Sequence, residues 1–174
     1  WQALPRRQFS AGALLQHAGE TSTRCWHLRS GVVRLFYLNE QGTERNRSFH
    51  GAGKWVAGSL PPLALPSPYA IEALAPVEAV ELDYSTLQDW MGAFPYIAPP
   101  LQEALGYVFQ SHARREAELL SHPPEARYQA FLASHAELAS QLPQHHVASY
   151  LGISPVSLSR IRARLGMVDA ARGG

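Results

Sequence analysis

The stretch PQHHVASYLGISPVSLSRIRARLG, from Pro143 to Gly166, contains two short helical patterns separated by a glycine. Ser154 is a favourable N-cap, and Pro155 suits the first position of a helix, where a backbone N–H has no partner within the helix. A helix is therefore expected to begin here and to run to about Leu165. Its apolar residues fall on one face and are expected to be buried, namely Leu158, Ile161 and Leu165.

A preceding helix is expected from Gln144 to Leu151, with an apolar face that includes Ala148. The small side chain of Ala148 lets two helices approach each other closely. Gly152 accepts a backbone conformation that other residues resist, and Ile153 is expected to fold back against the second helix. This combination of a small residue, a glycine turn and apolar contacts predicts a helix-turn-helix unit.

The outer face of the second helix carries small residues and arginines and no acidic residue. A DNA major groove admits such a helix, and the arginine guanidinium matches the two acceptors of guanine. The residues expected to contact DNA are Ser154, Pro155, Val156, Ser157, Ser159, Arg160 and Arg164. Arg160 is expected to read a base edge, and Ser154 to hold a phosphate at the helix N-terminus. The alternative is a helical hairpin whose arginine face is only solvated.

The composition limits the function classes further. The 174 residues carry a net charge of +1 and are 46% hydrophobic, which is enough for a core. No apolar run approaches the length of a membrane span and no secretory signal opens the chain, so a cytoplasmic protein without a membrane partner is expected. Cys25 is the only cysteine, which argues against an internal disulfide or a metal centre held by several thiolates. No cofactor is expected.

Short apolar stretches cut by turn residues run from about Phe9 to Asp83. This spacing is typical of an antiparallel sandwich or barrel. In the stretch VVRLFYL, residues 32–38, apolar positions alternate with Arg34 and Phe36, which predicts a strand with one buried face. Residues 58–68 contain four prolines and are expected to form a loop, and residues 85–91 a short helix.

The apolar period changes after Pro95 to a four-three spacing, which is typical of a helix that packs on a partner helix. The residues expected at a dimer interface are Leu101, Leu105, Val108, His112, Arg115 and Leu119. Pro123 and Pro124 end this helix, and Pro124 suits the first turn of another helix.

The order of a short-stranded roll, a long helix and a helix-turn-helix resembles the Crp/Fnr family of bacterial transcription regulators over nearly the whole chain. Residues 143–165, PQHHVASYLGISPVSLSRIRARL, look like the recognition unit of one branch, and residues 30–49, SGVVRLFYLNEQGTERNRSF, like its central hairpin. The resemblance implies an α+β fold with an antiparallel, jelly-roll-like β-roll sensor domain of the cyclic-nucleotide-binding type over residues 1–95. A dimerisation helix over residues 96–121 and a helix-turn-helix DNA-binding domain over residues 122–174 would follow.

The resemblance also implies a homodimer that binds double-stranded DNA at a palindromic promoter site, with RNA polymerase and a small-molecule effector as further candidate partners. In members that bind cyclic nucleotides, a Gly-Glu pair and a later arginine hold the ligand. Here Gly58 or Ser59 stands at the glutamate position, and Ser67 or Pro68 at the arginine position. A cyclic phosphate would be buried unpaired, so cyclic AMP is not the expected effector. Val156 stands where many members have glutamate, so contact with a thymine methyl replaces recognition of cytosine.

Two other function classes are open. A cupin-type enzyme also has a small β-roll, but it needs clustered metal ligands, commonly a His-x-His pair, and the sequence contains none. His145 and His146 are adjacent, and neighbours on a helix diverge by about 100°. The chain is therefore not expected to be an enzyme. The remaining alternative is a ligand-binding or interaction module of cupin-like β-roll type without DNA binding.

Overall fold

The computed structural model describes residues 3–167 of the chain. The chain divides into two compact units, residues 1–113 and residues 114–174. This division falls inside a long helix, so the domain boundaries expected after residues 95 and 121 stay a prediction. None of the helices within residues 3–167 is long and apolar enough to cross a membrane.

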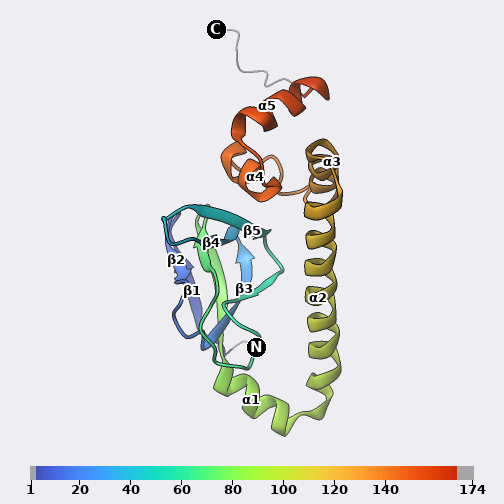
Figure 1. Ribbon diagram of the computed structural model, residues 1–174. Helices are drawn as coiled ribbons and strands as arrows, with labels where there is room; N and C mark the ends of the chain where they lie inside the picture. The colour runs from blue at the N-terminus through green and yellow to red at the C-terminus, as the bar shows by residue number, and fades with distance from the viewer. Residues whose placement is uncertain (1–2, 168–174) are drawn as a thin grey trace. The chain divides into compact units, whose positions relative to one another are not determined.

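The first unit contains an antiparallel β-roll of two four-stranded sheets (Figure 1). Its strands are β1 (Arg6–Phe9), β2 (Leu14–Gln16), β3 (Arg24–Ser30), β4 (Val33–Leu38), β5 (Glu44–His50), β6 (Trp55–Ala57), β7 (Ala70–Ala73) and β8 (Val77–Asp83). The strand orders are β1-β8-β3-β6 and β2-β7-β4-β5. The predicted roll is confirmed. The sequence pattern missed β1 and β6, because strands of four and three residues are too short to show a period.

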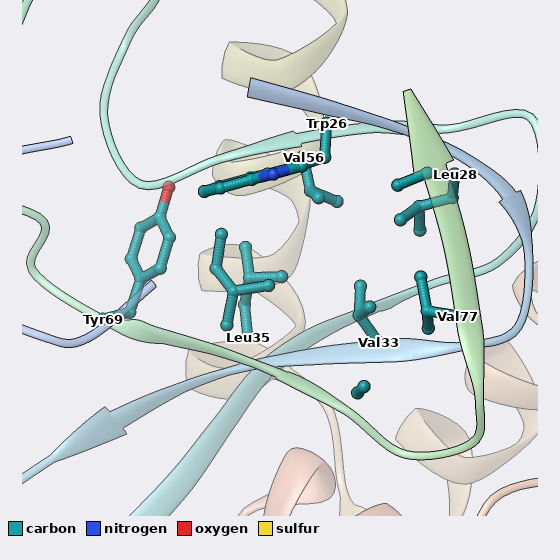
Figure 2. Packing of buried hydrophobic residues seen from close by; sticks show 10 residues of the cluster. Trp26, Leu28, Val33, Leu35, Val56, Tyr69 and Val77 are labelled. Carbon is teal, nitrogen blue, oxygen red and sulfur yellow. The ribbon is translucent and has the colours of Figure 1, made fainter. Parts of the chain in front are cut away.

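The core of the roll lies between the two sheets, because alternate residues of each strand point inward. Trp26 and Leu28 enter from β3, and Val33 and Leu35 enter from β4. Figure 2 shows the Trp26 indole and the Tyr69 ring directed into the same interior. Burial of this apolar surface is the main force that holds the two sheets together.

Strand β4 departs from the predicted single buried face. Arg34 and Phe36 are buried as well as Val33 and Leu35, whereas Tyr37 is 44% exposed. Arg34 is buried at low cost because its guanidinium is paired: it lies 2.5 Å from Glu72 and 2.6 Å from Glu44 and donates to Asn46 at 3.1 Å. It also covers the Phe36 ring at 4.1 Å. The prediction of a single buried face was therefore wrong for this strand.

The segment from Gly58 to Pro68 is a loop, as its prolines predicted, and its leucines at 60, 63 and 65 are exposed. Helix α1 (Tyr84–Ala93) follows β8 directly and confirms the short predicted helix. Tyr84 and Leu87 of this helix pack with Cys25 and Leu82 in a second apolar cluster. A single 3-10 turn, η1 (Pro95–Ile97), then leads into the long helix.

The helices after Pro95 agree with the sequence pattern. They are α2 (Ala98–Ser121), α3 (Pro124–Ser134), α4 (Gln144–Leu151) and α5 (Pro155–Arg164). Helix α2 is 24 residues long and has no fully buried residue. Pro124 occupies the first turn of α3, where its missing N–H leaves no hydrogen bond unmade. Tyr128 and Phe131 of α3 are buried in the second unit.

Candidate nucleic-acid interface

Helix α4 ends in a tight turn because Gly152 adopts a left-handed backbone, with φ 70° and ψ 31°. The N–H of Ile153 donates to the Ala148 carbonyl at 3.1 Å, which satisfies one of the free carbonyls at the helix end. Val147, Ala148 and Leu151 form the buried face of α4. The turn therefore reverses the chain within two residues and directs it into α5.

Helix α5 begins at the predicted residue and is capped as its sequence suggests. The Ser154 hydroxyl accepts from the Ser157 N–H at 3.1 Å, and Pro155 fills the first helical position. Leu158 and Ile161 are buried, so they fix the rotation of the helix about its axis. The opposite face of α5 is consequently presented outward.

The outward face of α5 carries residues that sequence reasoning assigned to DNA. Val156 is 61% exposed, which is unusual for a branched apolar side chain, and Ser159 and Arg160 are exposed beside it. The hydroxyl groups of Ser154 and Ser157 lie 2.9 Å apart at the start of the helix. We call this surface of α5 the strip; it consists of Ser154, Val156, Ser157, Ser159 and Arg160.

The three arginines of α5 have different surroundings. Within residues 3–167, Arg160 has no hydrogen-bond or ion-pair partner. Arg162 is half-buried and donates to the Tyr128 hydroxyl at 3.4 Å, so it belongs to the packing between α5 and α3. Arg164 lies 2.9 Å from Glu125 on α3. Within the part of the chain that the structure describes, Arg160 is therefore the arginine of α5 that need not leave a partner to meet a ligand.

A groove of about 900 Å³ separates α3 from α5. Its lining includes Pro124, Glu125 and Gln129 from α3 and Ser157, Arg160 and Arg164 from α5. The groove opens along the outward face of α5, because Ser157 and Arg160 belong to both surfaces. Sequence reasoning missed the two polar residues that α3 contributes, Glu125 and Gln129. Nothing in the local pattern of α3 could have revealed them, because they approach α5 only through the tertiary fold.

Two residues expected at a dimer interface have contacts within their own unit. Arg47 donates to His112 at 2.5 Å, and its guanidinium covers the Tyr69 ring at 4.3 Å. Burial and the Arg47 charge both lower the pKa of His112. Arg115 donates to the Tyr150 carbonyl and lies 3.8 Å from the Tyr150 ring centroid. Arg115 thus satisfies a carbonyl in the last turn of α4.

The other interface candidates divide by exposure. Leu101 and Leu105 are half-buried, whereas Val108 and Leu119 are exposed. The most exposed aliphatic or phenylalanine side chains of α2 are two that the four-three pattern did not select, Phe109 at 70% and Leu120 at 80%. The helix therefore presents a second apolar face, beside the predicted one.

The interior of the roll is closely packed at Gly58 and Ser67, two of the residues expected at the positions of a ligand-binding glutamate and arginine. The Ser67 hydroxyl donates to the Tyr69 carbonyl at 2.6 Å, and Ser67 is fully buried. Gly58 has so little room that an added Cβ would lie 2.8 Å from Gln16 Cγ and 2.9 Å from Ser67 Oγ. The Ser22 hydroxyl accepts from the Gly58 N–H at 3.2 Å. Small polar groups satisfy one another here, and Gly58 and Ser67 themselves offer no cation to a phosphate.

Residues 6–93, slightly more than half of the chain, match the model of the cyclic nucleotide-binding domain family. The chain belongs to this family. Its cyclic nucleotide-binding domain comprises the whole roll together with α1. Family membership therefore explains the fold of the first unit up to α1. It does not identify a ligand, because Gly58 and Ser67 differ from the ligand-binding pattern.

The resemblance to Crp/Fnr regulators is also confirmed, and it extends beyond the cyclic nucleotide-binding domain. The anaerobic regulatory protein of Haemophilus influenzae is 22% identical over 178 residues, which cover 94% of this chain and 69% of that protein. The fumarate and nitrate reduction regulatory protein of Escherichia coli is 23% identical over 176 residues, covering 91% and 68%. The chain thus spans about two thirds of the length of these relatives.

Solved structures give the same fold. FixK2 from Bradyrhizobium japonicum superposes with a TM-score of 0.83 at 18% identity, over 98% of this chain and 90% of that one. A CooA variant from Carboxydothermus hydrogenoformans superposes with a TM-score of 0.76 at 16% identity, over 98% and 81%. At these identities the likeness establishes the architecture of roll, long helix and helix-turn-helix.

Proposed function

We propose that this chain is a sequence-specific DNA-binding transcription regulator of the Crp/Fnr type. One observation carries the proposal: the strip on α5 presents an exposed apolar residue, Val156, next to an arginine, Arg160, without a partner in residues 3–167. Helix α5 is held by a buried face and a capped N-terminus, so this strip is rigid before DNA arrives. Rigid presentation of an arginine suits recognition of guanine O6 and N7.

The other residues of α5 that were predicted to contact DNA have supporting roles in this proposal. Ser154, Pro155 and Ser157 lie at the start of α5, where hydroxyl groups and the positive end of the helix dipole favour a backbone phosphate. Val156 offers an apolar contact to a thymine methyl, and Ser159 a hydrogen bond to a base edge. Arg164 is near the other end of the helix, where it meets phosphate.

The regulator acts as a homodimer through α2, because a helix with an exposed apolar face is stabilised by a partner. A two-fold dimer places two α5 helices about 34 Å apart, one DNA turn, which makes the site an imperfect palindrome. The relatives named above support this assignment through their regulatory names. In this proposal the regulator acts in the cytoplasm, contacts RNA polymerase at the promoter and responds to a small-molecule effector other than cyclic AMP. It catalyses no reaction itself.

The test is selection of binding sites from random duplex DNA, followed by affinity measurement at two salt concentrations. The wild-type protein is expected to select a palindromic motif and to lose affinity steeply as salt rises. Arg160→Ala is expected to cost about 1–3 kcal/mol of binding free energy and to relax one base position in each half-site. Arg45→Ala, which removes an exposed arginine from β5, serves as the control and should leave the motif unchanged.

Two results would count against the proposal in different ways. If the wild-type protein binds no duplex DNA, the chain is a ligand-binding or interaction module and the assignment of function fails. If it selects a motif that Arg160→Ala leaves intact, DNA binding stands but Arg160 is not the residue that reads a base.

A further inference from the structure

The groove between α3 and α5 contains an acidic side chain at a surface where a DNA-binding protein needs positive charge. This side chain is Glu125, which forms an ion pair with Arg164 across the groove, with an N–O distance of 2.9 Å. Both side chains remain accessible, at 39% for Glu125 and 65% for Arg164. An ion pair with this much solvent contact contributes little to folding, because water screens it and two flexible side chains must be ordered.

The two exposed arginines of the groove therefore differ in availability, although they lie four residues apart on one face of α5. Arg160 has no partner within residues 3–167, whereas Glu125 neutralises Arg164. A backbone phosphate that enters the groove would meet both cations and would also approach the Glu125 carboxylate. Arginine forms short charge-assisted hydrogen bonds with phosphate as readily as with carboxylate, so phosphate and Glu125 compete for Arg164.

We propose that Glu125 is a built-in competitor of DNA, and that Arg164 leaves it to bind a backbone phosphate in the groove. This inference rests on the proposed function. The free protein keeps Arg164 paired, and the complex leaves Glu125 close to a phosphate that repels it. Glu125 therefore weakens binding to every sequence by a similar factor, because phosphate contacts carry no base information. It leaves the preferred motif unaltered and makes release from DNA easier.

The central experiment measures the affinity of the full chain for its selected duplex and for an unrelated duplex over a range of salt. Glu125→Gln keeps the size of the side chain and removes its charge. It is expected to tighten binding to both duplexes by roughly 1.5- to fivefold at low salt, the range of an exposed ion pair. The slope of log affinity against log salt should steepen by up to about one, because the Glu125 carboxylate freed in the wild-type complex retains a counterion and the Gln side chain retains none.

The matched control is Glu137→Gln, which makes the same change of net charge at an exposed residue that does not line the groove. It is expected to alter affinity far less than Glu125→Gln. Equal tightening by both variants would attribute the effect to net charge and would overturn the proposal. Unchanged or weaker binding by Glu125→Gln would also overturn it, because Glu125 would then hold Arg164 in its binding position.

A double-mutant cycle with Arg164→Gln tests the competition itself. Glu125→Gln is expected to gain less in the Arg164→Gln background than in the wild-type background, because no arginine remains to be released. An equal gain in both backgrounds would mean that Glu125 repels DNA without acting on Arg164, which contradicts the proposal. Failure of the wild-type protein to bind either duplex would instead reject the proposed function, and the two failures are thus distinguishable.

Discussion

Arg160, Arg162 and Arg164 differ because of their neighbours rather than because of their type. The helical period separates Arg162 from the other two, because it lies beside the buried residues of α5, where it reaches Tyr128. The period could not show that Glu125 pairs with Arg164, because the two residues are 39 positions apart in the chain and meet only after α3 and α5 have packed. A local pattern predicts which face a side chain occupies and is silent about distant partners.

Gly152 is a residue whose role the sequence did predict, and the structure makes the prediction quantitative. Gly152→Ala is expected to destabilise the fold by roughly 1–2 kcal/mol, because an L-residue resists the left-handed backbone that ends α4. The cost should be conformational only, since an added Cβ would lie 3.7 Å from Leu119 Cδ2, an ordinary contact. Denaturant unfolding followed by circular dichroism gives the measurement.

The control for this substitution is Gly92→Ala. Gly92 is helical in α1, and an added Cβ there would meet nothing within 4 Å. Alanine should be neutral or stabilising by up to about 1 kcal/mol at this position. Equal loss of stability in both variants would show that the turn conformation is not the cause.

At the scale of the element, α2 shows how far periodicity can be taken. The four-three spacing correctly predicted a long helix and the residues that share a face. It could not tell what each face contacts within the chain: His112 contacts Arg47 and Arg115 contacts Tyr150, and their place at a dimer interface stays a prediction. Both contacts depend on residues from other elements, which no period within α2 contains.

The exposed face of α2 leads to a prediction about the dimer. Phe109→Lys is expected to raise the dimer dissociation constant by at least about tenfold, because a charge replaces a 70% exposed aromatic ring that a partner would bury. Val108→Lys should have a smaller effect, and Leu38→Lys, at an exposed apolar residue of β4, should have none. Light scattering over a concentration series measures the three variants. A wild-type protein that is monomeric at micromolar concentration would contradict the prediction.

At the scale of the whole molecule, each of the two units has its own core and its own means of burying polar groups. The sequence predicted the roll from its turns and the helix-turn-helix from its caps, since both signals are local. It did not predict that Arg34 would be buried in the roll, because Glu44, Asn46 and Glu72 come from two other strands. Fold class was therefore accessible from the sequence, whereas the polar networks were not.

The packing of the roll leads to a prediction about ligands. Neither cyclic AMP nor cyclic GMP is expected to bind at physiological concentration, because Ser67 or Pro68 is expected at the position of a phosphate-binding arginine. Arg34 and Arg47 cannot substitute easily, since Arg34 is paired with Glu72 and Arg47 contacts His112 and Tyr69. Isothermal titration calorimetry is the measurement. Micromolar affinity for either nucleotide would mean that one of these arginines leaves its partner.

The stability of the chain should also depend on pH in a defined direction. Burial lowers the pKa of His135, and Arg115 adds to this effect, although the Phe131 carbonyl and Glu118 oppose it. A histidine with a lowered pKa binds fewer protons when folded than when unfolded, where its pKa is about 6.5. Its contribution to stability is therefore fully present above that value and is lost as the pH falls through the folded-state pKa.

The free energy of unfolding is accordingly expected to be lower at pH 5.5 than at pH 7.5, with His135 and His112 both contributing, since burial and Arg47 lower the pKa of His112. Denaturant unfolding at the two values measures the difference. His135→Gln removes the titrating group and keeps a polar side chain, so the difference should shrink. An undiminished difference in His135→Gln would place the titrating group elsewhere in the chain.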